Sequence, residues 1–279
     1  MSARTIVITG ASDGIGASAA GTLTAAGDEV VVVGRSPDKT KAVADRLGAR
    51  YYLADYSRLD DVRRLAETLR ENHPRIDVLA NNAGGIMGER QLTSDGFEKT
   101  FQVNHLAPFL LTHLLMDVLE ASRATVVNTA SIAAKLFSHL DLDDLGLEHG
   151  YTAEKAYGNG KLANILMARE LDRRYRERGI SAASFHPGLV QTGFASETSS
   201  LLRLVYHTPL RRLVTVSPEK GADTLVWLAT TTPGRDWPQG EYFAKRKVST
   251  SSPQASDAGL ARDFWDVSER LLGLDPTTR

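Results

Sequence analysis

Short β-branched runs alternate regularly along the chain with longer stretches of helical periodicity. The runs expected to form strands are residues 5–9, 29–33, 51–54, 76–80, 125–129 and 180–185. A long helix is predicted over 156–178, with Gly179 well placed to end it. Strands that alternate with helices are typical of parallel βαβ units. The sequence therefore predicts an α/β fold, a doubly wound parallel sheet of about seven strands with helices on both faces.

The bulk composition favours a single domain that binds small molecules. The 279 residues, 42% of them apolar, suffice for one large domain over 1–279. The formal charge of −1 creates no field that would attract nucleic acid or an anionic membrane. The chain has no cysteine, so disulfides and thiolate metal sites are excluded, and we expect no metal site. We find no export signal and no run long enough to span a membrane, which predicts a soluble cytoplasmic protein.

A glycine-rich turn over residues 9–16 joins the first strand to an alanine-rich helical stretch, 17–26. Glycines permit a tight turn and let the helix N-terminus present free N–H groups to a pyrophosphate. The alternative is an ordinary strand-to-helix turn capped by Ser12 or Asp13. The flanking strand and helix favour the nucleotide site. The predicted contacts are Gly10, Ser12, Asp13, Gly14, Ile15 and Gly16.

The end of the second strand bears on the choice between NADP(H) and NAD(H). A carboxylate here would bond a free ribose 2′-hydroxyl and repel a 2′-phosphate, whereas an arginine can pair with that phosphate. The sequence has Gly34 and Arg35 at this place, which favours NADP(H). Arg35 could also be a solvated surface charge, so NAD(H) stays open as the alternative.

Tyr157 and Lys161 lie four residues apart in the long predicted helix, so both side chains share one face. A tyrosine is a poor base at neutral pH unless its pKa, near 10, falls, and a lysine ammonium within about 4–6 Å can lower it by roughly 1–3 units. Ser131 follows the fifth strand, where its hydroxyl could hold a substrate oxygen as negative charge develops. Each has a plainer interpretation, an exposed helical pair for the first two and a helix cap for Ser131.

Together these motifs resemble the short-chain dehydrogenase/reductase family. The resemblance rests on the turn at 9–16, Asn81-Asn82-Ala83-Gly84, Ser131, and Tyr157 with Lys161, all in the order of the family. It implies a Rossmann-type sheet with strand order 3-2-1-4-5-6-7. It also implies that Tyr157 protonates the carbonyl oxygen, Ser131 polarises it and Lys161 holds the ribose. The implied catalytic residues are Asn104, Ser131, Tyr157 and Lys161, with Asn104 linking the lysine to solvent through water.

The same resemblance implies further contacts to the dinucleotide. Asp55 would hold the adenine amino group, and the turn after the sixth strand would grip the carboxamide through Thr192 and the Val190 backbone. In NADP-preferring relatives the position of Asp13 is often basic, which counts against the preference drawn from Arg35. The implied contacts beyond the first turn and Arg35 are Asp55, Tyr56, Asn82, Ala83, Gly84, Tyr157, Lys161, Pro187, Gly188, Val190 and Thr192.

Within the family, residues 103–112, the insert between Ser131 and Tyr157, and the C-terminal segment resemble the retinol dehydrogenase-like branch. A lid over the substrate is expected at about 193–216, with an amphipathic flank packed on the body as the alternative. Residues 136–150, 194–214 and 242–252 would shape an apolar pocket for a medium-sized substrate. The long helices on either side of the fifth strand often form dimer faces in the family, so a homodimer or homotetramer stays open.

The expected function is an NADP(H)-dependent oxidoreductase that reduces a ketone or aldehyde, or oxidises the matching alcohol, by hydride transfer. Two alternatives are left open. One is a dinucleotide-sensing scaffold that has lost the chemistry, against which the intact catalytic set argues. The other is a C=C reductase that uses the same tyrosine. His105 and His186 have no role in the catalytic set and are interpreted as structural.

Overall fold

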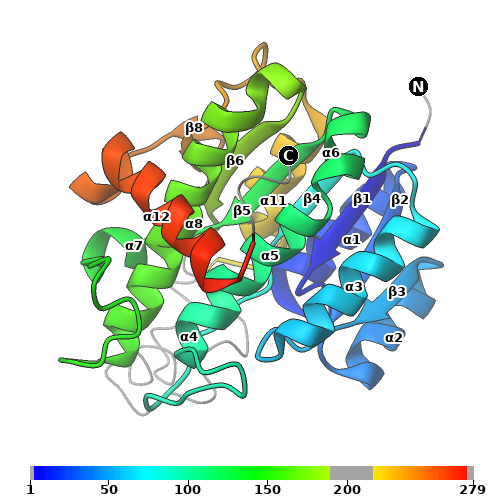
Figure 1. Cartoon of the computed structure of the whole chain (residues 1–279). Helices are drawn as coiled ribbons and strands as arrows, with labels where there is room; N and C mark the ends of the chain where they lie inside the picture. Colours follow the sequence, from blue (N-terminus) through cyan, green and yellow to red (C-terminus); the bar gives the residue numbers. More distant parts are fainter. Residues whose placement is uncertain (1–2, 189–215, 275–279) are drawn as a thin grey trace.

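The computed structural model describes residues 3–188 and 216–274, and an eight-stranded sheet lies at the centre of this part of the chain (Figure 1). The strands are β1 (Thr5–Thr9), β2 (Glu29–Gly34), β3 (Arg50–Leu53), β4 (Val78–Asn81), β5 (Thr125–Thr129), β6 (Ser181–His186), β7 (Tyr242–Ala244) and β8 (Lys247–Val248). Their order is β3-β2-β1-β4-β5-β6-β7-β8. The predicted order 3-2-1-4-5-6-7 is confirmed, and each of these neighbouring pairs is parallel.

The strand β8 pairs antiparallel with β7 and was not predicted from the sequence. A two-residue turn joins them, and its residues Lys245 and Arg246 have φ of 51° and 60°. Positive φ at both central residues is the geometry of a hairpin turn that usually carries Asn or Gly. Neither residue is of that kind, so the turn left no signal in the sequence.

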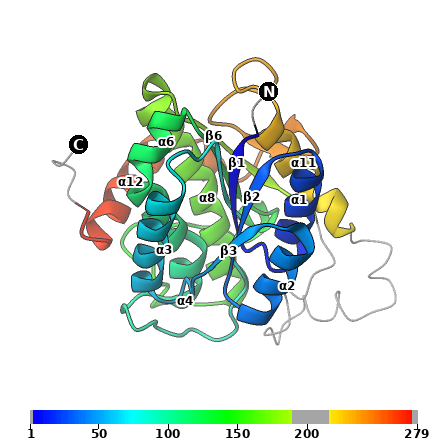
Figure 2. The same ribbon diagram turned by 90° about the vertical axis from the view of Figure 1, so that its right-hand side faces the viewer.

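Helices cover both faces of the sheet, as predicted (Figure 2). One layer holds α1 (Gly14–Ala25), α2 (Pro37–Leu47) and α11 (Pro218–Thr230). The other holds α3 (Leu59–Asn72), α5 (Ala107–Leu114) and α8 (Ala153–Tyr175), and α12 (Ala258–Leu271) packs on the outside of α8. The shorter helical segments are α4 (Lys99–Phe101), a π-helical turn (Gln102–Leu106), α6 (Met116–Ser122), α7 (Ala133–Leu136), and two 3₁₀ turns (Arg176–Arg178 and Pro253–Ser256). No helix of the described ranges is long and apolar enough to cross a membrane.

The core is split between the two faces because successive strand residues point to opposite sides of a sheet. In β1, Ile6 and Ile8 pack in the cluster under α1 and α11, whereas Val7 packs in the cluster under α3, α5 and α8. All three side chains are fully buried. The β-branched runs that predicted the strands thus supply both hydrophobic layers.

The long helix α8 begins three residues earlier than predicted. Thr152 caps it by accepting a hydrogen bond on its side chain from the Lys155 N–H. The helix continues into a 3₁₀ turn that ends at Gly179, whose φ of 95° favours glycine. Tyr157 and Lys161 therefore lie in the first turns of α8, near the carboxyl edge of the sheet.

The C-terminal helix α12 packs on α5 and α8. The Phe264 and His105 rings lie 4.5 Å apart between centroids, and Trp265 lies 4.7 Å from Phe109. His105 is fully buried, its Nε2 lies 2.8 Å from the Ser268 hydroxyl, and burial lowers its pKa to about 3. His105 thus packs in the core, away from the polar residues at the strand ends. The homodimer or homotetramer expected through these helices stays a prediction, and α12 already covers part of their outer surface.

Candidate active site

The glycine-rich turn between β1 and α1 has no room for a side chain at Gly10 or at Gly16. A Cβ on Gly10 would lie 2.8 Å from the Ala83 Cα, and one on Gly16 would lie 2.4 Å from the Gly10 carbonyl oxygen. Asp13 is the N-cap of α1, and its carboxylate accepts a hydrogen bond of 2.7 Å from the Gly14 N–H. The turn therefore combines the predicted cap with a close backbone approach, and it leaves the other N–H groups of the helix start for an anion.

The Asn81-Asn82-Ala83-Gly84 turn is tied to the first strand by Thr9. The Thr9 hydroxyl accepts hydrogen bonds of 3.0 Å from the backbone N–H groups of Asn82 and Ala83. The Asn82 amide in turn donates to the Thr9 carbonyl and accepts from the Thr129 hydroxyl. These bonds hold the carboxyl ends of β1, β4 and β5 together, which is where ligands bind in open α/β sheets.

Lys161 is the buried cation of this edge. Lys161 is only 2% exposed, and its Nζ donates a hydrogen bond of 3.1 Å to the Thr129 carbonyl. The same Nζ lies 5.5 Å from the centroid of the Tyr157 ring. Burial lowers the pKa of Lys161 to about 7. An ammonium has three donor hydrogens, so the group has capacity to bind ribose hydroxyls as well.

Asn104 lies in the π-helical turn that precedes α5. Its side-chain amide donates to the carbonyls of Gly85 (2.8 Å) and Thr100 (2.9 Å), and its carbonyl oxygen accepts from the Gly85 N–H at 3.1 Å. A Cβ on Gly84 would lie 2.5 Å from the Asn104 Oδ1 and 2.9 Å from the Lys161 Nζ. Asn104 and Lys161 thus flank the same small space, and wide π turns of this kind occur often at functional sites.

Ala133 connects Ser131 to a small apolar cluster that includes Tyr157. The Ser131 hydroxyl accepts a hydrogen bond of 3.2 Å from the N–H of Ala133, the first residue of α7, whereas the N-cap of this helix is Ile132. Ile86, Ala133 and Tyr157 form a hydrophobic cluster separate from both core layers. Tyr157 is 8% exposed, so its ring is packed between neighbours. The arrangement provides an apolar wall beside groups that can donate and accept protons.

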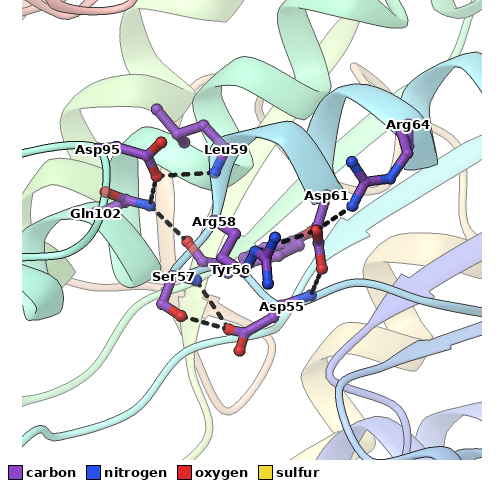
Figure 3. Close-up of polar contacts among 9 residues, drawn as sticks. All are labelled: Asp55, Tyr56, Ser57, Arg58, Leu59, Asp61, Arg64, Asp95 and Gln102. Atoms are coloured by element: carbon purple, nitrogen blue, oxygen red, sulfur yellow. Dashed lines mark hydrogen bonds and ion pairs between the residues drawn. The ribbon is translucent and has the colours of Figure 1, made fainter.

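The loop after β3, predicted to bind the adenine, is internally bonded (Figure 3). The Asp55 Oδ1 accepts hydrogen bonds from the Ser57 N–H at 3.0 Å and the Ser57 hydroxyl at 2.8 Å. Asp55 therefore closes a turn of its own loop and does not cap α3. Tyr56 packs in the core, where burial raises its pKa.

Asp95 and Gln102, which were not predicted as site residues, bind this loop although they lie far from it in the sequence. The Asp95 Oδ2 accepts hydrogen bonds from the Leu59 N–H at 2.9 Å and from the Gln102 Nε2 at 2.8 Å (Figure 3). The same Gln102 nitrogen lies 3.1 Å from the Tyr56 carbonyl. Asp95 thus caps α3 from 36 residues away along the chain. No local sequence pattern marks such a partner.

The turn after β6 is described only in part. Pro187 and Gly188 follow β6 as predicted, Gly188 has φ of 85°, and its N–H donates to the His186 Nδ1 at 3.0 Å. His186 therefore shapes this turn. The predicted contacts Val190 and Thr192, and the lid expected at 193–216 apart from its last residue, lie outside the described residues.

The end of β2 is crowded around Gly34. A Cβ at Gly34 would lie 2.3 Å from the Thr40 hydroxyl oxygen and 3.0 Å from the Ser12 Cβ. The next residue, Arg35, is exposed. The sequence analysis missed Thr40, which fills the space that a side chain at Gly34 would need.

The chain is similar to known proteins over nearly its whole length. Residues 4–201 match the family model described as short chain dehydrogenase. The chain is 40% identical over 277 residues to a protein of Streptomyces sp. (strain C5) provisionally named daunorubicin C-13 ketoreductase DnrU, covering 97% of this chain and 93% of that protein. Human retinol dehydrogenase 13 is 34% identical over 290 residues, covering 99% of this chain and 87% of the relative.

Solved structures share the fold. A protein from Mycobacterium paratuberculosis aligns with a TM-score of 0.77 at 31% identity, covering 97% of this chain and 93% of that one. The structure titled as an active-site complex of Pseudomonas aeruginosa RhlG with NADP aligns with a TM-score of 0.70 at 26% identity, covering 94% of this chain and 97% of that one.

Proposed function

Because the chain belongs to the short-chain dehydrogenase family, with retinol dehydrogenase-like relatives, we propose that it is an NADP(H)-dependent reductase of a ketone in an apolar, medium-sized substrate. The observation that carries the proposal is the buried Lys161 Nζ, 5.5 Å from the Tyr157 ring at the carboxyl edge of the sheet. A buried cation beside a phenol favours the phenolate form and so allows a tyrosine to exchange a proton near neutral pH.

Each residue of the site has a distinct role in the proposed reaction. The Tyr157 hydroxyl donates its proton to the substrate oxygen, and the Ser131 hydroxyl donates a hydrogen bond to the same oxygen. Lys161, with a pKa of about 7, can pass a proton at its Nζ near neutral pH. Asn104 ties its own π turn to the segment after β4 by bonding both backbone groups of Gly85. When bound, the reduced nicotinamide supplies the hydride.

The dinucleotide would be held by the glycine turn, by Asp55 and by the turn at Asn82-Ala83-Gly84. The close contacts of Gly10 and Gly16 fit a backbone-lined cradle for a pyrophosphate. The preference for NADP(H) is supported by two features at the end of β2. Thr40 and Ser12 leave no space for a carboxylate at Gly34, and the exposed Arg35 is free to pair with a 2′-phosphate.

The apolar surface beyond Ser131 supports the proposed substrate class. Leu136 is 61% exposed and Phe137 40% exposed, where large apolar side chains are usually buried. This segment is pressed onto the catalytic helix, because a Cβ on Gly158 would lie 2.9 Å from the Phe137 carbonyl carbon. An exposed apolar surface next to polar catalytic groups fits a hydrophobic ligand. The name of the Streptomyces relative supports a ketone as the group reduced.

The test is a screen of nicotinamide oxidation against ketones, aldehydes and α,β-unsaturated carbonyls, run with NADPH and with NADH. We expect NADPH to be oxidised with apolar ketones, faster than NADH, and mass spectrometry to find the alcohol. Reduction of a C=C bond would replace this proposal with the C=C reductase. NADPH binding without turnover of any compound would favour the sensing scaffold.

A further inference from the structure

The first turn of α2 carries a lysine that the cofactor site described so far does not use. The Lys39 Nζ lies 3.5 Å from the Asp13 Oδ2, with the two side chains 65% and 68% exposed. Asp13 belongs to the phosphate turn and Lys39 to α2, the helix that follows β2, so the ion pair joins these two segments. We propose that Lys39 is a second cation of the 2′-phosphate site, which neutralises Asp13 in the free protein and pairs with the 2′-phosphate of bound NADP(H). This inference rests on the proposed use of NADP(H).

Groups from three segments converge at this point. Ser12 comes from the phosphate turn and would lie within 3.2 Å of a Cβ on Gly34 through its hydroxyl. Arg35 follows β2 directly, and Lys39 lies four residues further on, in the first turn of α2. Ser36 caps α2 without a side-chain hydrogen bond to the helix. The exposed Arg35 and Lys39 therefore flank the start of α2, in the segment that follows Gly34, where a carboxylate is excluded.

The Asp13–Lys39 pair explains how an acid in the phosphate turn is compatible with NADP(H). An uncompensated Asp13 carboxylate would repel a 2′-phosphate, which carries close to two negative charges at neutral pH. The ion pair cancels that charge. An exposed pair contributes little stability of its own, so Lys39 can turn from Asp13 to a more highly charged phosphate. Asp13 meanwhile keeps its bond to the Gly14 N–H, which holds it in place as the cap of α1.

The chain offers a matched control on the same helix. Lys41 lies two residues beyond Lys39, and its Nζ is 2.5 Å from the Asp45 Oδ2, in an exposed pair within α2. Replacing Lys41 removes the same charge from the same helix without touching the phosphate turn. A difference in nucleotide affinity between the two lysine variants therefore reflects the position of the lost charge and not the change in net charge.

The experiment measures binding of two nucleotide fragments to the full chain by calorimetry, 2′,5′-ADP with the 2′-phosphate and 5′-ADP without it. We expect Lys39→Met to weaken 2′,5′-ADP by about tenfold, the loss of one charge-assisted hydrogen bond, and 5′-ADP by less than about twofold. Lys41→Met should leave both affinities unchanged. Asp13→Asn should strengthen 2′,5′-ADP binding, because the repelling charge is removed. Equal affinities in the Lys39 and Lys41 variants, or an equal loss for both fragments, would overturn the inference.

This readout also separates the inference from the proposed function, since it needs no turnover. If the wild type binds 5′-ADP but gains nothing from the 2′-phosphate, the proposed NADP(H) preference fails and Lys39 with it. A second outcome is that the wild type favours 2′,5′-ADP, and that Arg35→Met reduces this preference whereas Lys39→Met does not. In that case the cofactor proposal stands and the role of Lys39 is refuted.

Discussion

Replacing Lys161 with methionine should stabilise the ligand-free protein while removing its activity. Lys161 is 2% exposed, and burial lowers its pKa from 10.5 to about 7, so the charged form is disfavoured in the folded state. Methionine has a similar length and no charge. The Thr129 carbonyl that accepts from Lys161 also accepts from the Asn164 amide at 3.0 Å, so the substitution leaves it paired.

The size of the effect follows from the shift in pKa. At about 1.4 kcal/mol per unit, the change from 10.5 to about 7 corresponds to about 5 kcal/mol against the charged lysine. The lost hydrogen bond offsets about 1 kcal/mol, and relaxation around a buried charge reduces the penalty further. We therefore expect the Lys161→Met protein to be more stable than the wild type by about 2–3 kcal/mol at pH 7.

The dependence on pH tests the cause. Because the folded-state pKa of Lys161 lies below its unfolded value, the unfolded chain binds more protons between pH 7 and 10.5, and wild-type stability rises with pH in this window. The advantage of Lys161→Met should therefore shrink as pH increases, by up to about 1.4 kcal/mol per unit.

Urea unfolding of both proteins from pH 6.5 to 9.5 measures this difference. Lys155→Met, on the same helix and only partly buried, is the control and should change the unfolding free energy by less than about 0.5 kcal/mol. A Lys161→Met protein that is less stable than the wild type at pH 7, or an advantage that does not vary with pH, would refute the reasoning.

Three further predictions concern packing. Gly16→Ala places a Cβ 2.4 Å from the Gly10 carbonyl oxygen and should destabilise the ligand-free protein by about 1–3 kcal/mol in urea unfolding; an unchanged midpoint would contradict the close approach. Ser268→Ala leaves the His105 Nε2 without its hydroxyl partner and should cost about 1–3 kcal/mol, a loss that Ser268→Thr should partly restore. Burial lowers the pKa of His105 to about 3, so its contribution to stability is present above pH 6.5 and falls as pH falls. The free energy of unfolding of His105→Phe should therefore change less between pH 7 and 5 than that of the wild type. An equal change in both proteins would contradict this.

Local patterns were sufficient to predict the first six strands and the helix α8. The β-branched runs of β1 and β2 stand between turns that break them, and both strands lie where they were predicted, β2 one residue longer. The helical spacing around Lys161, with Gly179 behind it, predicted α8 to within three residues at its start. These features depend on neighbours in the chain, which a single sequence displays.

Features that depend on distant partners were not predictable. The Asp95 cap of α3 comes from 36 residues away, and the Asp13–Lys39 pair joins the turn before α1 to the first turn of α2. The contact of Thr40 with Gly34 depends on how α2 returns to β2. Polar contacts of this kind have no periodicity, so only the folded chain reveals them.

In the proposed reaction the Tyr157 hydroxyl delivers a proton to a carbonyl oxygen beside the buried Lys161. This role is tested by steady-state reduction of a substrate found in the screen by Tyr157→Phe, alongside NADPH binding by fluorescence. Tyr175→Phe, at a buried tyrosine of the same helix, is the control. We expect Tyr157→Phe to lower kcat by about 10²–10⁴-fold, with the NADPH Kd within about twofold of the wild type and the control active. A Tyr157→Phe protein that reduces the substrate at the wild-type rate would contradict it.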